Sequence, residues 1–211
     1  MNTNLTELVF VLDRSGSMAS LAFDTIGGYN SMIEKQKNEQ GDAIVTTVLF
    51  DDKYEMLYSG VDIKKTEPLT DKQYYARGMT SLHDAVGKTI ADMDEKYSKL
   101  PDSLIPEKTL FVITTDGMEN ASREYTLSGI KAMIEAHKEK GWEFIFLGAN
   151  IDAVKVGGSM GIGADRSVPY KADSVGTAAN FAAMSFAASA VRGRRDIGDN
   201  WKKDIEKHNR K

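Results

Sequence analysis

At 211 residues the chain is long enough for one large domain with a complete core, or for one domain with a short appendage. It contains no cysteine, which excludes disulfides, zinc–thiolate sites and thiol nucleophiles and suits a reducing, cytoplasmic compartment. The net charge of -4 argues against a nucleic-acid binder, and neither a signal peptide nor a membrane-spanning run is recognisable, so no membrane role is expected.

The first predicted element is a strand over residues 7–12. Its apolar residues follow one another without a polar break, which is typical of a strand buried on both faces of a parallel sheet. The run ends in Asp13, and Ser15 and Ser17 follow closely. Open α/β sheets bind their ligands just past the carboxyl ends of their strands. A carboxylate and two hydroxyls are hard oxygen ligands, which suit Mg²⁺, Ca²⁺ or Mn²⁺.

A helix is predicted to follow this polar segment, with Asp24 as its N-cap. Gly27 and Gly28 lie inside the helix, where they lower helix propensity but allow close approach to the sheet. The apolar side chains recur at helical spacing and predict one buried face, made of Ile26, Tyr29, Met32 and Ile33.

Two strands are predicted over residues 42–50 and 53–59, with Asp51 and Asp52 as a tight turn between them. Strands joined by so short a connection pair antiparallel, because a parallel crossover needs many more residues. The second of these strands is therefore expected at an antiparallel edge of the sheet.

The second half of the chain alternates helices and strands in the same way. One helix starts at a capping box made by Ser81 and Asp84, and a strand over residues 108–114 leads to Asp116. The later elements are a helix from Thr126 ending before Gly141, a strand at 144–147, a short helix at 151–156, an edge strand at 167–170 and a helix at 173–191. The pattern predicts an α/β fold: a doubly wound, Rossmann-like, mostly parallel six-stranded sheet with one antiparallel edge strand and helices on both faces.

The composition changes near the C-terminal end. Residues 1–191 are predicted to form the α/β domain, whereas residues 192–211 are mostly charged and are expected to be a tail or a peripheral helix. The few large apolar side chains of this tail include Trp201 and Ile205.

Polar residues of three separate segments are expected to meet at one edge of the sheet. Asp13 and Asp116 each follow a buried strand, and Thr80 lies directly before a helix. If the two strands are neighbours, the three segments converge where their carboxyl ends meet. Two aspartates balance the charge of a divalent ion, and the hydroxyl groups add oxygen ligands without adding charge.

The chain resembles the von Willebrand factor A (vWA) domain and its metal-ion-dependent adhesion site, known as MIDAS. That motif is Asp-x-Ser-x-Ser after the first strand, a Thr before a helix and an Asp after the fourth strand. The chain matches it with Asp13-Arg14-Ser15-Gly16-Ser17, with Thr80 in Gly-Met-Thr-Ser-Leu-His-Asp-Ala, and with Asp116 in Ile-Thr-Thr-Asp-Gly. The resemblance covers about residues 7–191.

The resemblance implies that Ser15, Ser17 and Thr80 coordinate the ion directly, and that Asp13 and Asp116 contact it directly or through water. The ion would be Mg²⁺, or else Mn²⁺ or Ca²⁺, with an exchangeable position for a Glu or Asp of a protein partner. The resemblance further implies an intracellular, bacterial-type, non-enzymatic interaction module. Such members commonly act beside an ATPase or in a multiprotein complex.

Two other functions stay open at this point. A magnesium-dependent phosphohydrolase also places an Asp after the first strand, but it needs a second carboxylate where this chain has Ser15. A metal-free scaffold would use Ser15 and Ser17 only as turn residues. A Gly-x-Ser-x-Gly sequence at residues 157–161 has the spacing of a hydrolase nucleophile, but the stretch before it favours a helix rather than a strand.

Overall fold

The computed structural model describes residues 1–210 and contains one six-stranded sheet. The strand order is β3-β2-β1-β4-β5-β6; β3 is antiparallel to β2, and the other neighbours are parallel. The predicted fold class is confirmed, including the antiparallel edge strand. The strands are β1 (Asn2–Asp13), β2 (Asp42–Phe50), β3 (Tyr54–Asp62), β4 (Pro106–Thr115), β5 (Trp142–Ala149) and β6 (Ser167–Tyr170).

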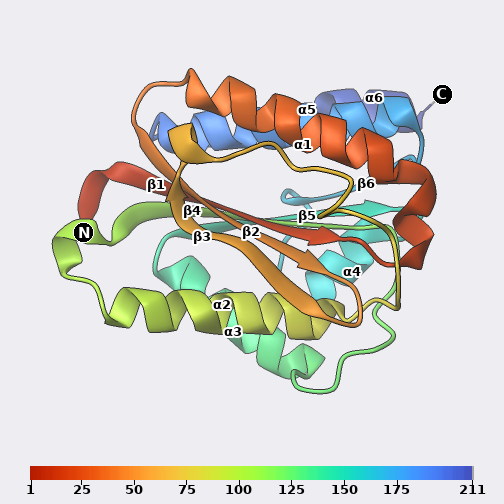
Figure 1. The fold of residues 1–211 in the computed structure, drawn as a ribbon, viewed down its shortest axis with the longest axis horizontal. Coiled ribbons are helices and arrows are strands. Elements are labelled where there is room, and N and C mark those ends of the chain that lie inside the picture. Colours follow the sequence, from red (N-terminus) through yellow and green to blue (C-terminus); the bar gives the residue numbers. More distant parts are fainter. Residues whose placement is uncertain (211) are drawn as a thin grey trace.

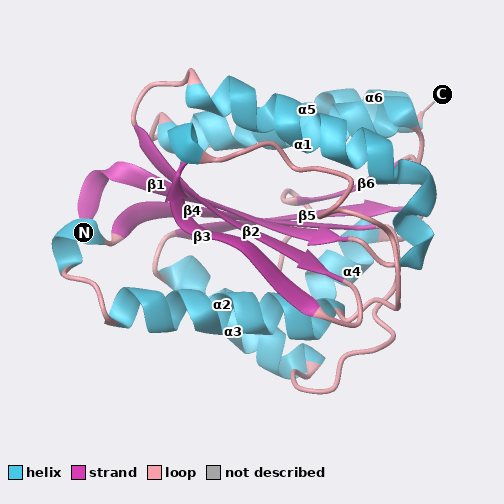
Figure 2. Cartoon of the chain, viewed as in Figure 1, coloured by secondary structure: helices cyan, strands magenta, loops and turns pink. Residues whose placement is uncertain are grey.

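Helices cover both faces of the sheet, in three layers (Figure 1 and Figure 2). One face carries α1 (Ala22–Lys37), α5 (Ser174–Arg192) and α6 (Lys203–Asn209). The other carries α2 (Leu82–Ser98), α3 (Leu127–Glu139) and α4 (Ala153–Ser159). Over residues 1–210, none of the helices has the length and apolar character needed to cross a membrane.

Two hydrophobic clusters fill the spaces between the sheet and the helix layers, and β1 contributes to both. Its even-numbered residues, Leu8, Phe10 and Leu12, pack toward α1 and α5, whereas Val9 and Val11 pack toward α2 and α3. All five side chains are fully buried. The alternation explains the unbroken apolar run, because a strand with helices on both faces has no solvent side.

The position of β1 determines where a ligand can bind. β1 pairs with β2 on one side and with β4 on the other, because the crossover through α1 runs from β1 to β2, whereas the crossover through α2 starts at β3 and ends beyond β1 at β4. The carboxyl ends of β1 and β4 lie side by side, with Leu12 paired to Thr114. This is the switch point at which open α/β sheets form a crevice beyond the strand ends.

The start of α1 differs from the prediction. A 3₁₀ helix over Gly16–Leu21 leads straight into α1, so Leu21 is the N-cap and gives no side-chain cap bond. Asp24 lies in the first turn of α1, and its carboxylate accepts a hydrogen bond of 2.7 Å from the Ser174 hydroxyl. The predicted cap at Asp24 was therefore wrong, because the chain already turns helically before that residue.

Gly28 permits a close contact between helices rather than with the sheet. A Cβ atom at Gly28 would lie 2.2 Å from the ring of Phe181 on α5, whereas a Cβ at Gly27 would meet nothing within 4 Å. We expect Gly28→Ala to lower the free energy of unfolding by about 1–3 kcal/mol through overpacking. Gly27→Ala, the matched control, should raise it by about 0.5–1 kcal/mol through helix propensity. Urea denaturation of both variants checks this, and equal effects would contradict it.

The segment after α5 packs against the core. Ile197, Trp201 and Ile205 are each no more than 3% exposed and belong to the cluster that also contains α1 and α5 side chains. Trp201 donates a hydrogen bond of 3.0 Å from its indole N–H to the Asp165 carbonyl. Part of the charged segment 192–211 is thus the short helix α6, and Lys211 lies outside the described residues.

Candidate metal centre

Four of the five predicted metal residues form one chain of hydrogen bonds beyond the ends of β1 and β4. The Ser15 amide donates to Asp13 Oδ1 at 2.6 Å, and the Ser15 and Ser17 hydroxyls lie 3.1 Å apart. The Ser17 hydroxyl in turn donates to Asp116 Oδ1 at 2.5 Å. The two aspartates, 103 positions apart in the sequence, are therefore linked through the two serines.

The fifth residue, Thr80, enters from the segment before α2. A Cβ atom at Gly117 would lie 3.0 Å from Thr80 Oγ1 and 3.6 Å from Ser17 Oγ, so both hydroxyls lie beside this glycine. A larger residue at position 117 would crowd them. Glycine is thus the residue that allows the hydroxyls of two segments to approach the strand end that carries Asp116.

Burial controls the charge state of the two aspartates. Asp13 has no exposed surface, and this burial raises its pKa to about 6, although hydrogen bonds from Thr115 and Ser15 lower it. Burial also raises the pKa of Asp116, and the hydrogen bond from Ser17 acts in the opposite direction. Two partly desolvated carboxylates at one place favour a cation between them.

Two further residues hold Asp13, and the motif did not identify either. The Thr115 hydroxyl donates to Asp13 Oδ2 at 2.5 Å, and the buried Tyr74 hydroxyl donates to the Asp13 carbonyl. The position of Thr115 at the end of a strand was a usable signal. Tyr74 gave none, because the loop that carries it reaches Asp13 only through the tertiary fold. Each oxygen of the Asp13 carboxylate accepts one hydrogen bond and keeps lone-pair capacity for an ion or water.

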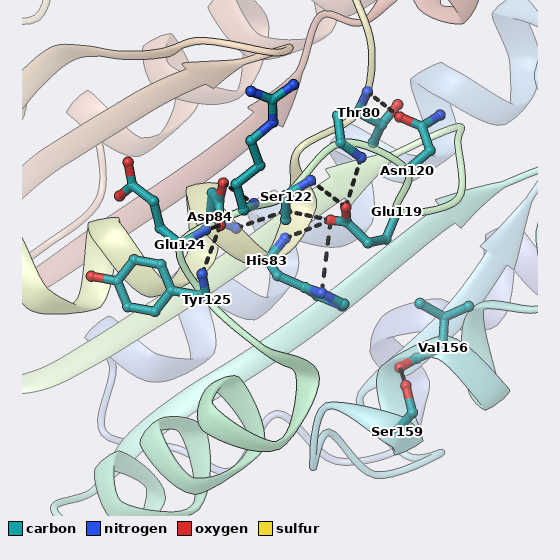
Figure 3. A network of polar contacts seen from close by, with 12 residues as sticks. Thr80, His83, Asp84, Glu119, Asn120, Ser122, Glu124, Tyr125, Val156 and Ser159 are labelled. Atoms are coloured by element: carbon teal, nitrogen blue, oxygen red, sulfur yellow. Dashed lines mark hydrogen bonds and ion pairs between the residues drawn. The ribbon is translucent and has the colours of Figure 1, made fainter.

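The loop between β4 and α3 caps the start of α2, as Figure 3 shows. Glu119 Oε2 accepts the His83 amide at 2.9 Å, and the Ser122 hydroxyl accepts the Asp84 amide at 3.0 Å. Ser81 makes no side-chain cap bond. The predicted capping box was therefore wrong, because a distant loop supplies the acceptors that the helix needs.

A side chain of α2 in turn binds the backbone of this loop. The Asp84 carboxylate accepts hydrogen bonds from the amides of Arg123, Glu124 and Tyr125, at 2.8, 2.9 and 2.8 Å (Figure 3). The predicted Thr126 cap of α3 is present, since its side chain accepts from the Gly129 amide. The loop that begins at Asp116 is thus fixed to the helix that begins just after Thr80.

Asn120 extends this contact to Thr80 itself. Its side-chain oxygen accepts the Thr80 backbone amide at 2.9 Å (Figure 3). Its backbone amide donates to the Thr80 carbonyl at 3.0 Å. This two-way pairing holds the backbone of Thr80 and leaves its hydroxyl available. Asn120 gave no sequence signal, since its role depends on the fold of the loop.

The donor set has the chemistry of a hard-cation site with few charges. Within residues 1–210, no three His, Asp or Glu side chains gather into a metal-binding group. The predicted set contains two carboxylates and three hydroxyls, and this composition fits Mg²⁺, Mn²⁺ or Ca²⁺ better than a soft metal. Ser17 is exposed, so the set faces solvent at the sheet edge.

The hydrolase-like sequence at residues 157–161 has a different structure from a nucleophile elbow. Ser159 is the last residue of α4, and its hydroxyl donates to the Val156 carbonyl at 2.6 Å (Figure 3). A nucleophile elbow needs a strand directly before the serine and a helix directly after it. The segment is thus the end of a short helix.

The sheet order, its antiparallel edge and the two helix layers define the vWA fold, and solved structures of that fold resemble this chain. A von Willebrand factor type A protein from Catenulispora acidiphila has a TM-score of 0.59 at 14% identity, over 89% of this chain and 43% of that one. No protein-family model and no curated protein matches the chain.

Two of the similar structures are described as containing a metal ion. Proximal thread matrix protein 1 from the mussel byssus, with a zinc-occupied MIDAS motif, has a TM-score of 0.59 at 12% identity over 89% of this chain and 46% of its own. Manganese-loaded TRAP protein from Plasmodium vivax has a TM-score of 0.53 at 18% identity over 70% of this chain and 58% of its own. The chain thus spans about half the length of the structures that it resembles.

Proposed function

We propose that the chain is a non-enzymatic module that binds a divalent cation and, through the ion, an acidic residue of a protein partner. The observation that supports this most directly is the convergence of three segments at the switch point of the sheet, with Ser17 bonded to Asp116 and Thr80 beside Gly117. The proposed ligands are Asp13, Ser15, Ser17, Thr80 and Asp116.

The proposed ion is Mg²⁺, with Mn²⁺ and Ca²⁺ as alternatives. All five proposed ligands offer oxygen, and Mg²⁺ takes six oxygens at about 2.0–2.1 Å. Water and a partner carboxylate would complete that number. The zinc and manganese in two structures of the same fold support a divalent ion at such a site, without selecting among metals.

A binding role is favoured over phosphoryl transfer by the residue at position 15. Phosphohydrolases of the type considered above use a second carboxylate there as a general acid, and a serine hydroxyl does not serve as one near pH 7. An exposed Ser17 leaves the ion open to a partner. We propose a cytoplasmic protein partner that supplies a Glu or Asp, such as an ATPase or a member of a multiprotein complex, and no nucleic-acid ligand.

Metal-dependent capture of a partner tests this function. Immobilised parent protein is expected to retain a partner from cell extract with Mg²⁺ present and to release it with a chelator. Thr80→Val, which removes one proposed ligand oxygen and keeps the side-chain shape, should retain none. Thr89→Val in α2 is the matched control, since this buried threonine is not among the proposed ligands and its hydroxyl donates to the Ala85 carbonyl within the helix. Retention that survives the chelator would contradict the metal-bridged function.

A further inference from the structure

A second set of contacts surrounds the proposed ligands and is centred on Asp51, in the turn between β2 and β3. Its fully buried carboxylate accepts hydrogen bonds on Oδ2 from Arg14 Nε at 2.9 Å and from Arg77 Nε at 2.8 Å. Oδ1 accepts the Lys53 amide at 2.7 Å, and the Asp51 carbonyl accepts the Ser81 amide at 3.0 Å. One residue of the hairpin thus holds two other segments.

Arg14 is the second part of this set, and in the chain it lies between two proposed ligands, Asp13 and Ser15. It is fully buried, an uncommon environment for arginine. Besides Asp51, it donates from Nη1 to the Gln73 carbonyl at 2.9 Å and from Nη2 to Glu55 Oε2 at 2.7 Å. A buried guanidinium with partners on each nitrogen restricts the backbone on both sides of it.

The segment that leads to α2 contacts both this arginine and the hairpin, through Arg77 and Gly78. The Arg77 amide donates to the Arg14 carbonyl at 2.9 Å, and the Gly16 amide donates to the Gly78 carbonyl at 3.2 Å. Gly78 has a φ of 66°, and a Cβ there would lie 1.8 Å from Asp52 Oδ1. The two ligand-bearing segments therefore bond directly to each other, and the second of them also lies tightly against the hairpin.

We propose that Asp51 is a positioning residue that sets the spacing between the segment carrying Ser15 and the segment carrying Thr80. It acts through Arg14 on the first segment, and through Arg77 and the Ser81 amide on the second. This role rests on the proposed function. Mg²⁺ demands near-ideal octahedral geometry, whereas Ca²⁺ accepts variable geometry, so a looser spacing weakens Mg²⁺ binding more.

Asp51→Asn in the full chain tests this role, because it removes the charge that both arginines bind. We expect calorimetric titration to show Mg²⁺ binding weakened by about 10–100-fold, the range for residues that orient metal ligands. Ca²⁺ binding should weaken less than Mg²⁺ binding. If the variant does not fold, Arg77→Gln takes its place, since Arg77 is partly exposed and its loss removes one of the two charged donors to Asp51.

Glu7→Gln is the matched control for a purely structural effect. Glu7 is an equally buried carboxylate near the middle of β1, away from the proposed ligands, where it pairs with Lys96 at 2.5 Å. We expect it to lower stability without changing metal affinity. The role of Asp51 is overturned, and the function stands, if the parent binds the ions and Asp51→Asn binds them equally well. The same holds if Asp51→Asn weakens the binding of both ions only as much as Glu7→Gln does. A parent that binds neither ion overturns the function and this role with it.

Discussion

Asp13→Asn is expected to abolish divalent-cation binding while leaving the fold intact. The change removes one of the two negative charges of the proposed site, so Mg²⁺ and Mn²⁺ affinity should fall by at least about 100-fold, more than for a residue that only orients ligands. The fold should persist because asparagine can still accept from the Ser15 amide and can donate to Thr115, whose hydroxyl then donates to the Gly117 carbonyl.

Calorimetric titration of the parent and of Asp13→Asn measures this effect. Asp152→Asn is a matched control, because Asp152 also follows a strand at this edge of the sheet but only caps α4 by accepting the Lys155 amide at 3.0 Å. Asparagine caps helices as well as aspartate does, so this control should bind ions as the parent does. Equal ion binding by Asp13→Asn and the parent would exclude Asp13 as a ligand.

The same substitution is expected to stabilise the ion-free protein at neutral pH. Burial raises the pKa of Asp13 from 3.8 to about 6, so the folded state holds its proton at a pH where the unfolded state has released it. Stability therefore falls as pH rises from about 4 to about 6, and the whole loss is present above pH 6. In chelator at pH 7.5, Asp13→Asn should gain roughly 1–3 kcal/mol over the parent, because asparagine has no buried charge.

Denaturant unfolding in chelator at pH 4 and pH 7.5 checks this second effect. The stability difference between parent and variant should be small at pH 4, where Asp13 is protonated in the folded state and only partly ionised in the unfolded state, and larger at pH 7.5. Saturating Mg²⁺ should then stabilise the parent alone, because only a protein that binds the ion in its folded state gains from it. A stability difference that does not change with pH would show that ionisation of Asp13 does not lower the stability of the folded protein.

The fold was predictable because its main signals are local. The apolar run of β1, the short turn at Asp51 and Asp52 and the alternation of helices with strands each depend on neighbouring residues. These patterns gave the six strands and the antiparallel edge. The resemblance in turn supplied the five candidate ligands by residue type and order.

The contacts that support those ligands could not be predicted, because they join residues far apart in sequence. Tyr74 and Asn120 contact Asp13 and Thr80 only after three loops have come together. The capping error at Ser81 has the same origin. A capping box at Ser81 is a local pattern, but the acceptors that the helix uses come from a loop that begins after β4.

The exchange of hydrogen bonds between α2 and the loop after β4 makes these two elements one mechanical unit. The loop bonds the first amides of the helix through Glu119 and Ser122, and the helix bonds the loop amides through Asp84. We therefore expect any displacement of this loop to be accompanied by a displacement of α2. Since Tyr97, in the last turn of α2, donates to Glu7 at 2.5 Å, the far end of this unit is fixed to the middle of β1.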